Sequence, residues 1–293
     1  MRNSNPVDGN VYYNCDWPTQ TSETMHTLID IGANLTHDSF DADRDAIIEN
    51  AAAVGVTRQI VTGADVDGSK QALALANQYP GQLWATAGVH PHHAKDYDAA
   101  ADAILRELAA GEPVVAVGEM GLDYFRNFSA HEEQEFAFDS QLQIAVDVQK
   151  PVFLHQRDGH GAFVAVLKNH LDNIPGGVAH CFTGTKDEMK TYLDMGLYVG
   201  ITGWICDERR GHDLQEAVKY LPKDRVMLET DAPYLLPRDL SKEQKKAING
   251  RRNEPALLPH VLAATASLMG LSEEELAEAA TSNSETLFGL PSR

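Results

Sequence analysis

Eight short apolar runs, separated by polar stretches and helical patterns, constrain the fold of this chain more than any other feature. The runs are near-continuous in Val, Ile, Leu and Ala, which is typical of parallel strands covered on both faces. They lie at Thr27–Ala33, Arg58–Gly63, Leu83–Val89, Pro113–Glu119, Pro151–His155, Gly177–Cys181, Leu197–Thr202 and Arg225–Thr230. Strand–helix alternation repeated in this way predicts an α/β fold, a TIM (β/α)8 barrel that forms a single domain.

Helical patterns with apolar residues at i, i+3 and i+4 fill most of the intervals between these runs. They predict helices within 46–55, 68–79, 132–148, 167–172, 186–196 and 213–221. Gly55 and Gly196 lie where a helix usually has its C′ residue. Two closing helices are expected in 254–270 and 272–290, the second with a capping box from Ser272 and Glu275. The polar, basic stretch Leu236–Asn253 predicts a loop after the eighth strand.

Ionisable side chains close four of the predicted strands. Glu119 ends PVVAVGE, His155 ends PVFLH, His180 ends GGVAH, and Asp231 follows RVMLET. The carboxyl ends of barrel strands meet at one mouth, so these side chains should converge. Burying such groups costs several kcal/mol each unless they are paired or bind metal. The set therefore predicts a divalent-metal site of mixed oxygen and imidazole ligands, in which Asp231 orients a water molecule or takes its proton.

Composition and charge restrict the class of function. The chain of 293 residues is 43% hydrophobic and 23% charged, as expected for a soluble protein with a large core. Its formal net charge of −19 argues against a protein that covers duplex DNA with a basic face. A small site for one strand end remains compatible with this charge, because a bound cation reverses the local potential.

The N-terminal segment and the cysteines bear on location. Residues 1–26 lack the apolar core of a signal peptide and predict a flexible leader before the domain over 27–293. Whether the leader is a genuine extension or precedes a start at Met25 stays open. No apolar run is long enough for a transmembrane helix, so no membrane association is expected. Cys15, Cys181 and Cys206 are odd in number and form no C-x-x-C pair, which indicates a cytoplasmic protein.

A series of short motifs resembles one protein family. The motifs are GVHPH (Gly88–His92), GEMGLDY (Gly118–Tyr124), HQRD (His155–Asp158), HCFTGT (His180–Thr185), ETDAPYLLP (Glu229–Pro237) and RRNEP (Arg251–Pro255). In this order, from Leu28 to Leu290, they resemble the TatD family of metal-dependent deoxyribonucleases. The strings NLT at 34–36, FRNFS at 125–129 and ITGWICDERRG at 201–211 are similar to the TatD subgroup itself.

The resemblance implies a fold, an activity and site residues. The implied fold is an amidohydrolase-like TIM barrel. The implied activity is magnesium-dependent 3′→5′ exonuclease action on the ends of single-stranded DNA and RNA, with a role in DNA repair or DNA degradation. The protein is expected to be a monomer. Glu119, His155, His180 and Asp231 are the implied metal-site residues, with Glu119 and Asp231 the catalytic candidates. His90 is implied to face the same mouth and contact the scissile phosphate, whereas His92 is expected to be a solvated loop residue.

One departure from the wider family bears on the ion. The resemblance implies that many relatives have an H-x-H pair of histidines at the end of the first strand. This chain has Gly32 and Asn34 at those two positions, within DIGANL. The loss of two nitrogen ligands favours Mg²⁺, as one or two ions, with Mn²⁺ or Zn²⁺ as substitutes. Asn34 could offer its carbonyl to the metal or its amide to phosphate.

Further polar and aromatic residues follow the predicted strands. Arg157 is expected to pair with a phosphate oxygen, and Thr183 and Thr185 to donate to phosphate where the next helix begins. The loop cations Arg126, Arg209, Arg210, Arg238, Arg251 and Arg252 either form a positive funnel at the mouth or are solvated surface residues. Tyr124, Phe125 and Trp204 either stack on bases of a single strand or pack within their own loops.

Two other functions remain open at this point. The same metal could hydrolyse another ester or amide, such as the bond in an aminoacyl-tRNA, because a barrel alone does not choose a chemistry. A non-catalytic quality-control protein would be expected to lack metal ligands, and of these only the H-x-H pair is missing.

Overall fold

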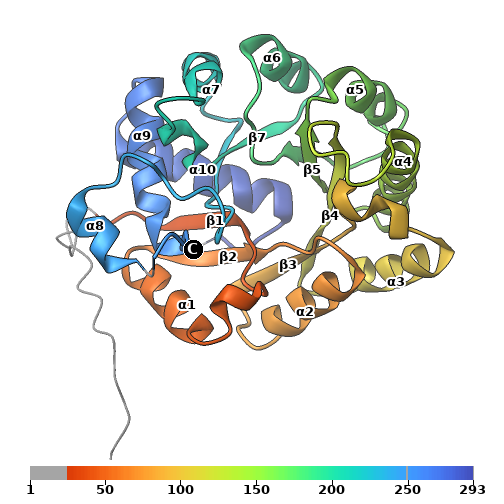
Figure 1. The fold of residues 1–293 in the computed structure, drawn as a ribbon, viewed down its shortest axis with the longest axis horizontal. Helices are drawn as coiled ribbons and strands as arrows, with labels where there is room; N and C mark the ends of the chain where they lie inside the picture. The colour runs from red at the N-terminus through yellow and green to blue at the C-terminus, as the bar shows by residue number, and fades with distance from the viewer. Residues whose placement is uncertain (1–24, 249, 293) are drawn as a thin grey trace, which may run out of the picture.

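Eight parallel strands form one sheet in sequence order in the computed structural model, which describes residues 25–248 and 250–292 (Figure 1). The strands are β1 (Leu28–Ala33), β2 (Val56–Val61), β3 (Leu83–Ala87), β4 (Val114–Asp123), β5 (Val152–Arg157), β6 (Gly177–Ala179), β7 (Tyr198–Ile201) and β8 (Val226–Leu228). Backbone bonds from Asp231 N to Gly32 O (2.8 Å) and from Asn34 N to Ala232 O (2.7 Å) join the last strand to the first. The predicted TIM barrel is therefore confirmed. Residues 1–24 of the predicted leader lie outside the described residues.

Helices surround the ring of strands (Figure 1). They are α1 (Arg44–Ala53), α2 (Val66–Ala76), α3 (Ala99–Ala110), α4 (His131–Val148), α5 (His160–Lys168), α6 (Lys186–Asp194), α7 (His212–Ala217), α8 (Lys242–Ala247), α9 (Leu258–Met269) and α10 (Glu273–Phe288). Short 3-10 helices are η1 (Asp38–Phe40), η2 (Pro91–Asp96), η3 (Gly203–Cys206), η4 (Val218–Tyr220) and η5 (Pro255–Leu257). Across the described ranges no single helix could cross a membrane by length and apolarity, although Pro255–Met269 and Glu273–Phe288, bent by 108°, meet that test as a pair.

The C-terminal helix closes one end of the barrel. Phe288 and Leu290 pack against a cluster of side chains inside the ring that includes Ile31 and Phe153. Arg58, near the start of β2, donates to Pro291 O (2.8 Å) and to Glu285 Oε1 (2.7 Å). These contacts cover the amino ends of the strands, so the opposite mouth, formed by the carboxyl ends, is left to the functional site.

Most predicted elements are confirmed; the exceptions are the ends of two strands, one misplaced helix and two helices that were not predicted. β4 continues to Asp123 and β5 to Arg157, so Glu119 and His155 lie within strands and not at their ends. The helix predicted within 167–172 is wrong: α5 occupies His160–Lys168, where Phe163 and Leu167 face the core. The interval after β3, where no helix was expected, holds α3, and the loop predicted over 236–253 contains α8. Positive φ at Gly55 (96°) and Gly196 (79°) confirms the predicted helix ends, as does the capping box of α10.

Candidate active site

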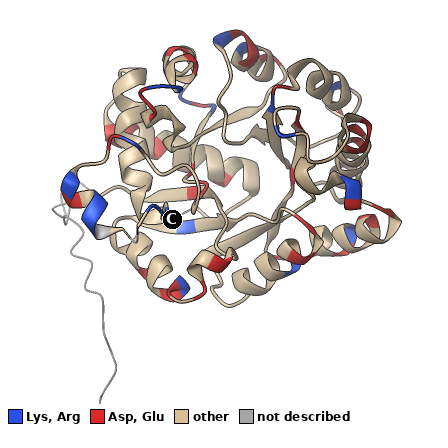
Figure 2. Cartoon of the chain, viewed as in Figure 1, with Lys and Arg blue, Asp and Glu red and all other residues tan. Residues whose placement is uncertain are grey.

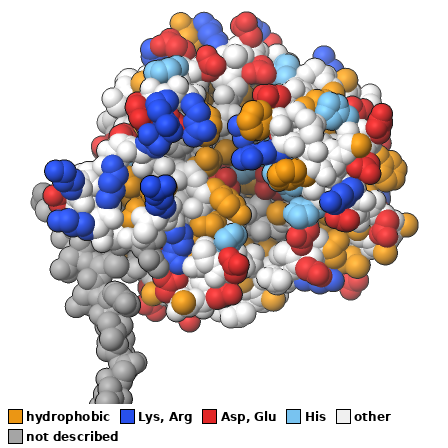
Figure 3. All heavy atoms as spheres, in the orientation of Figure 1, with side chains coloured by type: hydrophobic (Ala, Val, Ile, Leu, Met, Phe, Trp, Pro, Cys, Tyr) orange, Lys and Arg blue, Asp and Glu red, His pale blue; other side chains and the backbone are white. Residues whose placement is uncertain are grey.

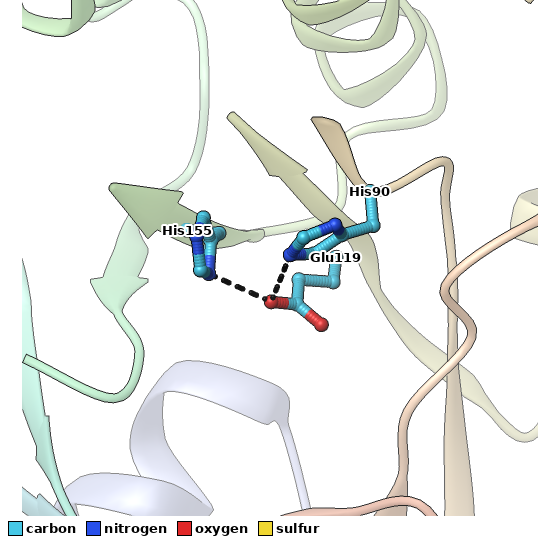
Figure 4. A group of neighbouring side chains, drawn as sticks. All are labelled: His90, Glu119 and His155. Carbon is cyan, nitrogen blue, oxygen red and sulfur yellow. Dashed lines mark ion pairs between the residues drawn. The ribbon is translucent and has the colours of Figure 1, made fainter. Parts of the chain in front are cut away.

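Glu119 is the centre of the site, because three imidazoles surround one of its carboxylate oxygens. Glu119 Oε1 lies 2.9 Å from His180 Nε2, 3.1 Å from His155 Nδ1 and 3.4 Å from His90 Nε2. The donor atoms of His90, Glu119 and His155 all lie within 4.8 Å of one another, and Figure 4 shows both imidazoles directed at the same oxygen. The structure thus brings three of the four predicted metal-site residues together and adds His90, which was predicted as a phosphate contact.

The strands place these side chains through close backbone contacts. A Cβ added at Gly88 would lie 2.4 Å from the carbonyl carbon of Gly118, and one at Gly118 would lie 2.2 Å from Phe153 O. Glycines at these two positions therefore let the segment after β3 approach β4, and β4 approach β5. Gly118 also has φ of 140°, which side-chain-bearing residues rarely adopt. This crowding brings His90 within reach of Glu119.

A second carboxylate, Glu229, holds His180. It is fully buried, and its Oε2 accepts from His180 Nδ1 at 2.8 Å while its Oε1 accepts from the backbone N–H of Cys181. A Cβ added at Gly32 or Gly200 would lie only 2.4 or 2.3 Å from these oxygens, so the two glycines form the space for the carboxylate. A carboxylate on the far nitrogen of a histidine fixes the tautomer that a metal ligand needs. The sequence prediction missed Glu229, although it stands two residues before Asp231 in the ETD string.

The same observation explains one departure noted in the sequence. A histidine at position 32 would compete with Glu229 for its space, because the first side-chain atom already lies 2.4 Å from Glu229 Oε2. Asn34, at the second histidine position, donates its amide to Asp231 Oδ1 at 3.0 Å. The first strand therefore supports the carboxylates after β8.

Asp123 is a further carboxylate that sequence reasoning missed. Its Oδ2 lies 2.8 Å from His92 Nε2 and 3.6 Å from His155 Nε2. His92, expected to be solvated, is therefore half-buried and hydrogen-bonded, so that expectation was wrong. Asp123 lies within the GLDY string, but that string does not indicate that Asp123 contacts His92 and His155.

Asp231 takes no part in the ion pairs of the histidine cluster, among the residues that the structure describes. Its backbone is held at φ 55° by the bond from its N–H to Gly32 O. Burial raises the pKa of Asp231 to about 7. The charge of His180 and the hydrogen bond from Asn34 lower this pKa, whereas the charges of Glu119 and Glu229 raise it further. Within 25–248 and 250–292, its carboxylate forms no ion pair with an imidazole. The predicted quartet is thus three adjoining side chains with Asp231 within electrostatic reach.

Protonation in the cluster follows from burial and from its neighbours. Burial raises the pKa of Glu119, but the His90 and His180 charges, with hydrogen bonds from His155 and His180, outweigh burial and hold that pKa well below its usual range. Burial lowers the pKa of His180, but Glu229 and Glu119 raise it well above the usual value. Burial lowers the pKa of His90 well below its usual value, although the charge of Glu119 acts in the opposite direction.

The donor set fits a divalent cation. Three imidazole nitrogens converge on one carboxylate oxygen, and His155 Nε2, at 3.6 Å from Asp123 Oδ2, is buried without a hydrogen bond. Imidazole and carboxylate are ligands of Zn²⁺ and Mn²⁺, and carboxylates and water are ligands of Mg²⁺. Glu119, His90, His155 and His180 could hold such an ion, and Asp231 lies within electrostatic reach of Glu119 and His180.

The predicted substrate contacts are arranged less uniformly. Arg157 stacks over Phe125, 3.9 Å from its ring centre, and Thr183 is half-buried in the turn after β6. Thr185 caps α6 by accepting from Glu188 N. Tyr124 stacks on His131 with centroids 3.5 Å apart, so this ring packs within its own loop.

Several predicted funnel arginines are already paired. Arg252 forms a bidentate pair with Asp43, Arg210 binds Asp207, and Arg238 binds Glu208. The lysines of α8, which colour this helix blue in Figure 2, are exposed. Figure 3 shows Lys and Arg side chains gathered on the α8 side of this face, beside a central hollow. On this face, basic side chains therefore gather on one side of the hollow.

Comparison with known proteins identifies the family. A sequence model of the TatD related DNase family matches residues 29–289. The chain belongs to the TatD related DNase family. A Pantoea vagans protein named "3'-5' ssDNA/RNA exonuclease TatD" is 50% identical over 263 residues, which cover 90% of this chain and 100% of that protein. A Salmonella typhimurium protein of the same name is 48% identical over 89% of this chain and 98% of its own length.

Solved structures agree with this family and with the fold. The TatD family hydrolase from Entamoeba histolytica has a TM-score of 0.81 at 27% identity, covering 91% of this chain and 99% of its own. The TatD homolog YJJV from Escherichia coli has a TM-score of 0.81 at 30% identity, covering 90% and 98%. The TatD-family protein described here is accordingly a metal-dependent hydrolase with an amidohydrolase-like barrel.

Proposed function

We propose that this TatD-family protein is a divalent-cation-dependent 3′→5′ exonuclease that hydrolyses phosphodiester bonds at the ends of single-stranded DNA and RNA. The observation that carries the proposal is the convergence of His90, His155 and His180 on Glu119 Oε1 at the barrel mouth, with Asp231 within electrostatic reach. The names of the relatives supply the substrate and the polarity. Such an activity would serve DNA degradation or DNA repair, and the free thiols of Cys181 and Cys206 fit a cytoplasmic enzyme.

The residues of the site have separable roles in this proposal. A bound divalent cation would polarise the scissile phosphodiester and acidify a water molecule. Asp231 accepts the proton of the attacking water, and Asn34 orients the Asp231 carboxylate through its amide. Glu229 fixes the tautomer of His180 by accepting from Nδ1. Arg157 and Thr183 bind the phosphate oxygens of the terminal nucleotides.

Exposed aromatic rings support a single-stranded substrate. Phe125 and Phe128, after β4, are 53% and 57% exposed, and Tyr234, after β8, is 51% exposed. The ring centres of Phe128 and His92 lie 4.7 Å apart, and the backbone N–H of Tyr234 donates to Asp231 O at 2.9 Å, so both residues lie beside the site. Splayed bases stack on such rings, whereas bases within a duplex are already stacked on each other.

The ligands of the site bear on which divalent cation the protein uses. Glycine and asparagine at positions 32 and 34, together with the carboxylates of Glu119 and Asp231, favour Mg²⁺. The three imidazoles of the cluster favour Mn²⁺ or Zn²⁺ over Mg²⁺. We propose that the enzyme uses Mg²⁺ and that Mn²⁺ or Zn²⁺ can substitute for it.

One experiment tests activity, polarity and ion together. Single-stranded oligonucleotides labelled at the 3′ or the 5′ end are digested with Mg²⁺, Mn²⁺ or Zn²⁺, using wild type, Glu119→Ala and Asp231→Ala. Immediate release of the 3′ label with gradual shortening of the 5′-labelled strand is expected, and both variants should lose it. Full activity in both variants would refute the assignment. Turnover of a mischarged tRNA without oligonucleotide cleavage would instead favour hydrolysis of the aminoacyl ester bond.

A further inference from the structure

A second group of metal-binding side chains lies outside the active site. Cys206, Asp239 and His260 bring one sulfur, one carboxylate oxygen and one imidazole nitrogen within 4.8 Å of one another. They come from η3, from the segment between β8 and α8, and from α9. The group shares no residue with the cluster around Glu119, and neither the proposed mechanism nor the substrate contacts use it.

The contacts within this group do not form a nucleophilic pair. His260 Nε2 lies 2.7 Å from Asp239 Oδ1, and the thiol of Cys206 interacts with the same Asp239 carboxyl group. Cys206 is buried, and burial with the Asp239 charge raises the pKa of its thiol. A cysteine activated by histidine would have the opposite environment, with a lowered pKa. The buried environment of Cys206 therefore does not favour a reactive thiolate.

The distances suit a small tetrahedral cation. Bond lengths of about 2.3 Å for sulfur and 2.0–2.1 Å for nitrogen or oxygen require neighbouring ligand atoms to be about 3.3–3.6 Å apart. The present donor atoms, with separations from 2.7 Å up to at most 4.8 Å, bracket that range. The Asp239 side chain is 52% exposed and so can turn to adjust, whereas Cys206 and His260 are held by η3 and α9.

Gln244 supports the imidazole from α8. Its side-chain amide lies 3.4 Å from His260 Nδ1, and its carbonyl oxygen accepts from Ser241 N in the capping box of α8. A hydrogen-bonding partner on the far nitrogen is the usual companion of a histidine ligand. It also connects the proposed site directly to α8.

We propose that Cys206, Asp239 and His260 bind a thiophilic divalent cation of the Zn²⁺ class, which fastens the segment after β8 to η3 and α9. Binding releases the thiol proton, and a water molecule completes the tetrahedron. The cation stabilises the loop that carries the basic residues of α8 and has no part in phosphodiester hydrolysis.

Cobalt substitution tests the site directly, because Co²⁺ bound by a thiolate has a near-ultraviolet charge-transfer band that Zn²⁺ lacks. The untagged full-length protein is titrated with Co²⁺ under saturating Mg²⁺, which does not compete for thiolate ligands. One equivalent giving the band, and its loss on adding Zn²⁺, are expected. Cys206→Ser should abolish the band, whereas the matched variant Cys181→Ser should keep it. A band that persists in Cys206→Ser, or no band in the wild type, overturns the proposal.

Limited proteolysis tests the structural consequence. Trypsin cleaves after Lys242, Lys245 and Lys246 in α8, and Zn²⁺ should slow this cleavage by about tenfold or more in the wild type. His260→Gln, which keeps a polar side chain at the position, should remove the protection. Equal protection by Zn²⁺ in wild type and His260→Gln would show that these three side chains are only a hydrogen-bonded contact.

Discussion

Replacing Glu229 with glutamine isolates the role of the buried carboxylate behind His180. Both of its oxygens accept hydrogen bonds, one from His180 Nδ1 and one from Cys181 N. Glutamine has a single carbonyl oxygen, and the space between Gly32 and Gly200 prevents the side chain from turning away. One buried donor therefore faces an amide NH₂, at a cost of about 1–3 kcal/mol.

The expected loss agrees with the behaviour of histidine ligands elsewhere. Removing the partner of a metal-binding histidine usually lowers metal affinity or activity by about 10–100-fold, or about 1.4–2.8 kcal/mol. We therefore expect Glu229→Gln to require about 10–100 times more Mg²⁺ for half-maximal cleavage of a 3′-labelled single strand. Calorimetric titration of the metal should show the same shift.

A matched control separates this effect from general destabilisation. Glu285 is a partly buried carboxylate that pairs with Arg58 at 2.7 Å at the opposite end of the barrel. Glu285→Gln should lower the unfolding temperature and leave the Mg²⁺ dependence unchanged. If a folded Glu229→Gln protein has the metal dependence of the wild type, the proposed positioning role is wrong.

Three further predictions follow from particular groups. Burial raises the pKa of Asp30 from 3.8 to about 7, so the folded state holds a proton that the unfolded chain has lost. Its stabilising contribution is complete below about pH 4 and is lost as pH rises through about 7. Urea unfolding of Asp30→Asn should therefore show a gain over wild type that grows across this window, towards an upper limit of about 4 kcal/mol; a pH-independent difference would contradict it. Phe128→Leu should raise the KM for a single-stranded oligonucleotide roughly tenfold by loss of stacking, but not for an abasic strand, whereas Phe136→Leu on α4 should change neither. EDTA should lower the unfolding temperature, and Mg²⁺ at about 100 times its dissociation constant should restore about 2.7 kcal/mol; unchanged unfolding would count against a bound cation.

The sequence predicted the barrel well because its signals are local. Each strand is an apolar run that is recognisable from its own residues, and the order of strands in the sheet is the order in the chain. The ends of the strands are not local. β4 continues past Glu119 because Met120 and Gly121 pair with Leu154 and His155 on β5, an interaction that no pattern within β4 reveals.

The chemistry of the site was predictable only in part for the same reason. Glu119, His155 and His180 follow from their positions along strands. His90 reaches the cluster because β3 and β4 pack closely at Gly88 and Gly118.

The supporting carboxylates could not be inferred in this way, because Glu229 and Asp123 are identified by partners 31 to 49 residues distant. Asp30, which is fully buried, and Asp231, which is half-buried, add two more carboxyl groups whose pKa values are raised to about 7. Concentrating this much negative charge in a buried space is costly unless protons or a cation offset it. An ion in the mouth would offset that cost for Glu119, Glu229 and Asp231 together. We therefore expect cation binding, substrate hydrolysis and stability of the barrel to be linked, so that variants which weaken the ion also lower the unfolding temperature.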